Sequence, residues 1–178
     1  MKTYKVTIKG VRPLLMNKWV EDNSIKKRGE VQDSAELCEH KLYKLNGKLV
    51  QPAEHIERAM EKVASSFKIK GAGKKTYKDL VQGAVFIQPE FIEHKVQKWV
   101  VDKRTVVIPS TKGRILRFRP RLDEWELDFT VQVLDDRVTP EILKLILDEA
   151  GRLKGIGDGR SIGFGRFIVT RFEEVKKS

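Results

Sequence analysis

The chain has 178 residues, of which 40% are hydrophobic and 34% charged, a composition that excludes a collagen-like, low-complexity or largely disordered protein. It has no apolar run of roughly 18 residues, no signal-peptide core after Met1 and a single cysteine, Cys38, so we expect a cytoplasmic protein with no membrane contact or disulfide. The sequence has no HExxH motif or paired His/Asp metal spacing, and no nucleotide-binding motif, so we expect no metal or cofactor. The 36 Lys and Arg residues outnumber 25 Asp and Glu residues, and this net charge of +11 favours a polyanionic partner, nucleic acid first.

The first third of the chain predicts a strand, a hairpin and a helix. Residues 2–11 alternate between apolar and polar side chains, the pattern of a half-buried strand. Residues 17–34 are polar and carry Lys26, Lys27 and Arg28 in a row, which predicts a loop. Asn46-Gly47 predicts a two-residue hairpin turn. Pro52 then opens a helix whose apolar stripe comprises Ile56, Met60, Val63 and Phe67.

The rest of the chain predicts short strands and a second helix. Strands are expected near residues 83–88, 95–101, 114–119 and 125–133. Thr139 and Pro140 begin a helix that runs to Ala150 and stops at Gly151, and residues 164–172 form a final strand. This order predicts an α+β fold: one domain over residues 1–178, with a ferredoxin-like (RRM-like) antiparallel sheet, two helices, and insertions or loops at 17–51 and 68–113.

Basic residues cluster twice without acidic neighbours in the sequence. The first cluster lies in a glycine-interrupted loop and contains Lys68, Lys70, Lys74 and Lys75. The second contains Arg114, Arg117, Arg119 and Arg121, and the last three share one face of an extended strand. Guanidinium groups suit phosphate oxygens, so both clusters are candidate nucleic-acid-binding residues. The alternative interpretation is a solvated sheet face.

Six of the 13 glycines lie within residues 151–165. The segment follows a helix, so it does not match a dinucleotide fingerprint, and no phosphate-loop motif is present. We expect a loop that a ligand backbone approaches closely, most clearly at Gly163, with Gly157 left open between ligand contact and structure. A purely structural loop is the alternative, and Asp158 is expected as a turn residue. The candidate binding residues are Gly155, Gly157, Gly159, Arg160, Gly163, Gly165 and Arg166.

The sequence GIGDGRSIGFGRF, at residues 155–167 between the second helix and the last strand, resembles the RAMP superfamily of CRISPR-associated RNA-binding proteins. The segments VRPLLMN, QPAEHIERAM, RFRPRLDEW and AGRLKGIGDGRSIGFGRF are also similar to small bacteriophage and prophage proteins. The resemblance implies binding of single-stranded RNA or DNA, and it does not by itself imply cleavage. Repeat-processing endoribonucleases usually carry two ferredoxin-like domains. Room for about one such domain with insertions therefore favours a non-catalytic binder. Self-association along the strand is a further contact that this function allows.

Two other functions stay open. A metal-independent CRISPR repeat endoribonuclease needs a general base, and His55, in the first turn of the first helix, is the candidate over His40 and His94. A phage assembly or host-interaction protein would use its charge for solubility or packaging. The aromatic residues that could stack bases are Trp19, Trp99 and Tyr77, whereas Phe118 and Trp125 are expected in the core.

Overall fold

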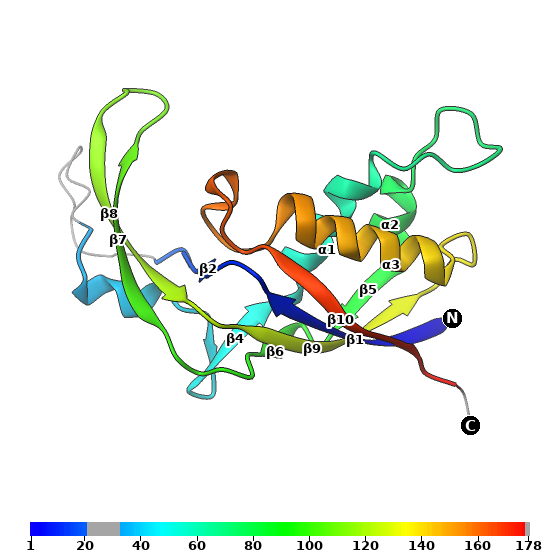
Figure 1. Ribbon diagram of the computed structural model, residues 1–178, viewed down its shortest axis with the longest axis horizontal. Coiled ribbons are helices and arrows are strands. Elements are labelled where there is room, and N and C mark those ends of the chain that lie inside the picture. The colour runs from blue at the N-terminus through cyan, green and yellow to red at the C-terminus, as the bar shows by residue number, and fades with distance from the viewer. Residues whose placement is uncertain (21–32, 177–178) are drawn as a thin grey trace.

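The computed structural model describes residues 1–20 and 33–176, so the basic run at Lys26, Lys27 and Arg28 lies outside the described residues. Its main sheet has the strand order β10-β1-β9-β5, and every neighbouring pair is antiparallel (Figure 1). The four strands are β1 (Lys2–Gly10), β5 (Val85–Gln88), β9 (Glu126–Val133) and β10 (Phe167–Glu174). The predicted mixture of helices with an antiparallel sheet is therefore confirmed.

Two helices, α1 (Ala53–Ala64) and α3 (Pro140–Glu149), cover one face of this sheet (Figure 1). Ile56 and Met60 of α1 are fully buried, as their spacing predicts. The side chain of Thr139 accepts a hydrogen bond from the backbone N–H of Ile142 at 3.4 Å, which caps α3. The core therefore lies between the helices and the inward-facing side chains of β1 and β9.

The hairpin strands β7 (Val100–Val107) and β8 (Arg114–Leu122) rise from one end of the sheet, on the side that the helices cover (Figure 1). The short strand β2 (Leu14–Leu15) pairs with the base of β8. The remaining elements are η1 (Glu36–Lys41), β3 (Lys44–Leu45), β4 (Lys48–Pro52), α2 (Lys78–Ala84) and β6 (Phe91–Glu93). Among the described residues, no helix is long and apolar enough to cross a membrane.

One local prediction is confirmed and several others need correction. The turn at Asn46-Gly47 is confirmed, since both residues have positive φ between β3 and β4. Residues 95–99 form no strand, and the residues before Val85 form α2 instead of a strand. Phe67 lies beyond the end of α1. The segment 68–113 is not an insertion throughout, because it supplies β5 of the main sheet, and 17–51 contains η1 and β3.

The helix predicted to begin at Thr139, α3, does not stop at Gly151 as expected. It continues as a π-helical turn, η2 (Ala150–Lys154), and ends at Gly155, whose φ is 69°. A Cβ on Gly151 would lie 2.2 Å from the carbonyl oxygen of Phe167, so glycine here serves close packing between the helix end and β10. This wide turn delivers the chain directly into the glycine-rich segment.

His94 is a core residue that makes stability depend on pH. It is 1% exposed, neither ring nitrogen has a hydrogen-bond partner, and its ring packs edge-on against Trp125. Burial lowers its pKa to about 4, from 6.5 in an exposed histidine. Above pH 6.5 both states are neutral and stability is unaffected, whereas between pH 6.5 and 4 the unfolded chain binds a proton that the folded protein does not.

We therefore expect the free energy of unfolding to fall by about 2 kcal/mol between pH 7 and pH 5 through His94 alone. Guanidinium denaturation across this pH range measures the loss. His94→Phe keeps a ring beside Trp125 and should flatten the profile, while His40→Gln, which alters an exposed histidine, should leave it unchanged. An equal pH dependence in His94→Phe would contradict the assignment.

Candidate nucleic-acid interface

The segment between η2 and β10, residues 155–166, is called the glycine loop. It packs against itself and against the chain entering β2: Gly165 N–H donates to the carbonyl of Pro13 and Asp158 N–H to that of Leu15, each at 2.8 Å. A Cβ on Gly157 would lie 2.5 Å from the same Leu15 oxygen, and one on Gly155 would lie 2.7 Å from the oxygen of Gly165. At Gly155, Gly157 and Gly165 the missing side chain thus makes room for the protein's own backbone, which favours the structural interpretation at these three positions.

Gly159 and Gly163 flank the 3-10 turn η3 (Arg160–Ile162), and both adopt positive φ. The space beside Gly163 is open except for the guanidinium of Arg12, 3.3 Å from the Cβ position. Close approach of a ligand at Gly163 therefore stays a prediction. Its φ of 91° adds a conformational reason for glycine that the sequence did not reveal.

The arginine ladder, defined as Arg117, Arg119 and Arg121, lies on one face of β8, opposite alternate residues of β7. Each of its members meets a carboxylate that is distant in the sequence or on the neighbouring strand. Arg117 lies 3.8 Å from Asp33, Arg119 lies 3.1 Å from Asp158, and Arg121 lies 3.2 Å from Asp102. The ion pairs of Arg117 and Arg119 thus join the hairpin to its surroundings, and that of Arg121 joins its two strands, although the arginine sequence itself contains no acid.

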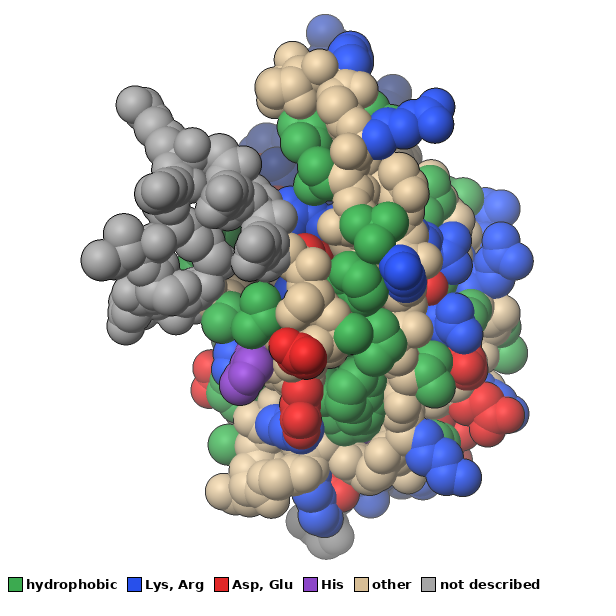
Figure 2. Space-filling view, turned by 90° about the vertical axis from the view of Figure 1, so that its left-hand side faces the viewer, with side chains coloured by type: hydrophobic (Ala, Val, Ile, Leu, Met, Phe, Trp, Pro, Cys, Tyr) green, Lys and Arg blue, Asp and Glu red, His purple; other side chains and the backbone are tan. Residues whose placement is uncertain are grey.

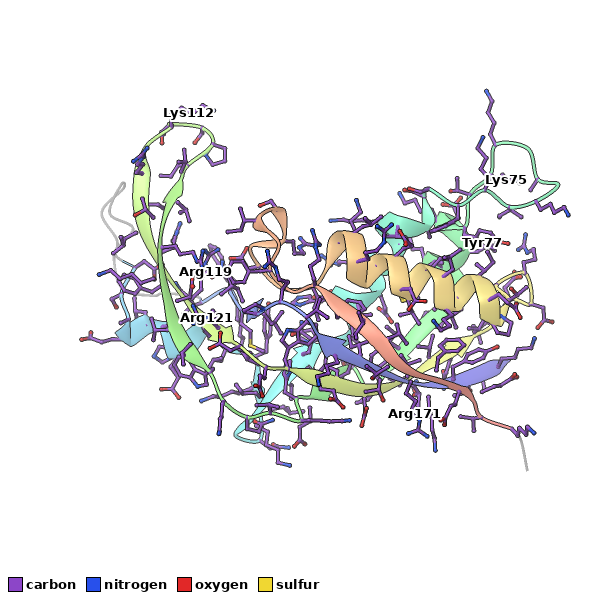
Figure 3. The ribbon with its side chains drawn as sticks, viewed as in Figure 1. Lys75, Tyr77, Lys112, Arg119, Arg121 and Arg171 are labelled. Atoms are coloured by element: carbon purple, nitrogen blue, oxygen red, sulfur yellow. The ribbon has the colours of Figure 1, made fainter. Side chains whose placement is uncertain are left out.

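The same face of the hairpin looks onto the glycine loop. Besides the Arg119–Asp158 pair, the guanidinium of Arg104 lies 4.7 Å from the ring centroid of Phe164. Figure 3 shows Arg119 and Arg121 near the base of the hairpin and Lys112 at its tip. The Arg119–Asp158 pair lines a cleft between the hairpin and the glycine loop, together with Thr105, Val106 and Val107 of β7.

This basic cleft has a volume of about 790 Å³. Among the described residues that line it, the charged ones are Asp158 and five bases, Lys62, Arg119, Lys154, Arg160 and Arg166. A groove of about 800 Å³ on the open face of the sheet has instead Lys5 and Arg171 against three acids. Positive charge is therefore concentrated in the cleft and not in every hollow of this basic protein.

Two arginines of the cleft have unused hydrogen-bond donors. Arg119 is 7% exposed, and within residues 1–20 and 33–176 its Nε and Nη2 have no partner although Nη1 is paired with Asp158. Arg166 donates from Nη2 to the carbonyl of Arg160 at 3.2 Å, while its Nη1 is buried and has no partner in the same part of the chain. Buried guanidinium N–H groups without acceptors are costly, and a phosphate oxygen is the acceptor that matches their charge and geometry.

Two basic residues of the cleft, Lys62 and Lys154, are not among the candidate binding residues chosen from the sequence. Lys62 is in the last turn of α1, and Lys154 is the last residue of η2. Lys62 begins a run of basic residues, and that run could have identified it as a binding residue. Lys154 could not be identified in this way, because the helix was expected to end at Gly151, before it.

The loop that carries Lys68, Lys70, Lys74 and Lys75 does not join the cleft. Figure 3 places Lys75 on a loop at the far end of the molecule from Arg119 and Lys112, above α2. The candidate binding residues therefore form two separate basic regions. Arg114 stands apart as well, exposed at the start of β8 near the hairpin tip.

The aromatic residues divide differently from expectation. Tyr77 is 8% exposed and belongs to the core, so it offers no free ring to a base, whereas Trp19 is 88% exposed. Trp125 is buried as predicted, but Phe118 is only half-buried, with Lys103 Nζ 5.7 Å from its ring centroid. Figure 2 shows hydrophobic side chains in a column on this side of the molecule, with Asp and Glu as well as Lys and Arg around it. Val107 and Leu116 are exposed on the outer face of the hairpin.

His55 lines a smaller pocket of about 200 Å³ together with Gly157 and Asp158, so the fold brings it beside the glycine loop. Burial is the main cause that lowers the pKa of His55, so the ring is neutral at pH 7.

Within residues 1–20 and 33–176, no group of three or more His, Cys, Asp or Glu side chains is placed to hold a metal ion.

No protein-family model matches the sequence, and no curated protein matches it. Solved structures do match its fold. A chain of a type III-B Cmr-beta complex bound to cognate target RNA has a TM-score of 0.58 at 14% identity, over 98% of this chain and 61% of that one. This chain thus spans less than two thirds of that subunit.

Two further structures match over nearly their whole length. A chain of a type IV-B CRISPR complex has a TM-score of 0.51 at 8% identity, over 99% of this chain and 91% of that one. Cmr6 from Pyrococcus furiosus has a TM-score of 0.50 at 12% identity, over 93% of this chain and 97% of that one. This chain shares the fold of CRISPR complex subunits. The resemblance to bacteriophage proteins stays a prediction.

Proposed function

We propose that this chain binds single-stranded nucleic acid without cleaving it, with the sugar-phosphate backbone in the basic cleft between the glycine loop and the β7–β8 hairpin. The observation that carries the proposal is the set of buried, unpartnered guanidinium N–H groups on Arg119 and Arg166. They line a cleft with five basic side chains and one acid among the described residues. Backbone binding of this kind positions a strand through its phosphates.

RNA is the favoured ligand, because one matched structure is described as bound to its cognate target RNA. We also propose that the chain is a RAMP-type protein whose main sheet with α1 and α3 is ferredoxin-like. The strand order β10-β1-β9-β5, with all pairs antiparallel, supports this. The basic loop with Lys68, Lys70, Lys74 and Lys75 would then serve a second segment of strand or a neighbouring copy bound along it.

The experiment is a binding titration of labelled single-stranded RNA and DNA at several salt concentrations. Phosphate contacts release counterions, so log affinity should fall linearly with log salt. Poly-glutamate of equal charge should compete poorly, because its carboxylates do not follow the spacing of a nucleic-acid backbone. Equal competition by poly-glutamate would replace the proposal with non-specific polyanion binding, as in a packaging or host-interaction protein.

A metal-independent endoribonuclease is the second candidate, and the position of His55 beside the glycine loop favours it. In the tautomer with its proton on Nδ1, the neutral ring would leave Nε2 free to act as a general base toward a 2′-hydroxyl. Incubation of labelled RNA with the protein and a chelator separates the two functions. Intact RNA supports the non-catalytic binder, and fragments that disappear in His55→Ala support the nuclease.

A further inference from the structure

The small pocket beside the basic cleft has a chemistry of its own. It lies between the end of β2, the first turn of α1 and the glycine loop, and Asp158 lines both hollows. A ligand in the pocket and a phosphate in the cleft would therefore sit next to the same side chain.

Gln51 lines this pocket and carries an unused acceptor. Its side chain is 1% exposed, and its Oε1 has no hydrogen-bond partner among the described residues. Its Nε2 is already engaged, 2.6 Å from Nδ1 of His55. A buried amide oxygen without a partner costs free energy, so a donor that enters the pocket would be bound favourably.

His55 and Tyr43 complete the arrangement. With the Gln51 amide donating to Nδ1, the neutral ring of His55 carries its proton on Nε2, which gives a ligand a second polar group. The Tyr43 ring stands nearly perpendicular to it, at 84° and 5.4 Å between centroids. One acceptor, one donor and aromatic surfaces are the groups that recognise a nucleobase by its edge and its face.

We propose that this pocket takes one nucleobase of the strand whose backbone lies in the basic cleft, and that Gln51 Oε1 accepts a hydrogen bond from the edge of that base. The inference rests on the proposed function and adds base preference to it. The strand would then be held by its phosphates on one side of Asp158 and read at one position on the other.

The test compares RNA decamers of A, C and U with an abasic decamer of the same charge. The wild-type protein should bind the best of the three about tenfold more tightly than the worst, and also about tenfold more tightly than the abasic strand. Gln51→Met keeps the length of the side chain and removes the acceptor, so its affinities should converge to within about twofold while the salt slope stays unchanged. Gln132→Met, on the open face of the sheet, is the matched control and should keep the full spread.

The inference is overturned if the wild-type protein binds the abasic decamer as tightly as the best base, or if Gln51→Met keeps the tenfold spread. In both cases salt-dependent binding would persist and the proposed function would stand. Loss of salt-dependent binding to every strand would instead overturn both. If Gln51→Met does not fold, as judged by circular dichroism, Tyr43→Leu removes the neighbouring ring and should narrow the spread in the same way.

Discussion

Replacing Arg160 and Arg166 together by glutamine should weaken binding of single-stranded nucleic acid about 100-fold at 0.1 M salt, on the order of 3 kcal/mol for two charge-assisted hydrogen bonds. Both residues line the basic cleft, and Arg166 Nη1 has no partner in the part of the chain that the structure describes. The slope of log affinity against log salt should become shallower by about 1.4, since each phosphate contact on a single strand contributes about 0.7. The loss should be similar for unrelated sequences, because phosphate contacts read no bases.

The matched control for this double variant is Arg137→Gln with Arg171→Gln, which removes the same net charge from exposed sites. Arg137 pairs with Asp135 and Arg171 with Glu173, and Figure 3 shows Arg171 below the sheet, away from the cleft. We expect the control to bind within about threefold of wild type. An equal loss in both double variants would mean that overall charge, and not the cleft, drives binding. Arg119 is avoided because its removal would leave Asp158 unpaired.

Replacing Gly165 by alanine should destabilise the fold by more than about 3 kcal/mol and lower the melting temperature by roughly 10 °C. The added Cβ would lie 1.8 Å from the carbonyl oxygen of Ile156, which is itself fully buried, and the φ of 69° disfavours a side chain. Differential scanning calorimetry measures the change.

Gly71→Ala separates the two causes of this destabilisation. Gly71 has a similar φ of 78°, but nothing lies within 4 Å of its Cβ position, so the substitution should cost only about 1 kcal/mol. If both variants lose the same stability, backbone conformation alone would account for the glycines, and the close packing inside the glycine loop would carry no energy.

Local sequence patterns predicted strands of the main sheet and one of the helices that cover it. The alternation of residues 2–11 and 125–133 became β1 and β9, and the capped helix at Thr139 became α3. These succeed because side-chain periodicity and capping depend on neighbours a few residues apart. The sequence did not predict the short helix α2, because this helix is only seven residues long and contains Gly83 near its end.

The site was less predictable, because its electrostatics depend on distant residues. Arg119 and Asp158 are 39 residues apart, and Arg117 and Asp33 are 84 apart, so sequence clustering could not show that the ladder is neutralised by carboxylates. The glycines were recognised as a group, but Gly157 packs against Leu15, far along the chain, and Gly155 and Gly165 pack against other residues of the folded loop. Sequence composition therefore located the loop without revealing why its glycines are needed.

The π-helical turn at Ala150–Lys154 makes the length of this segment as important as its composition. A π-helical turn holds more residues than an α-helical one, so deleting a single residue would let it close into regular α-helix. Every residue after the deletion would then be rotated by about 100° around the helix axis relative to α3. Lys154, which lines the basic cleft, would turn away from it, and Gly155 would enter the loop out of register with Gly165. Insertions and deletions should accordingly be tolerated at the hairpin tip near Lys112 and rejected between α3 and the glycine loop.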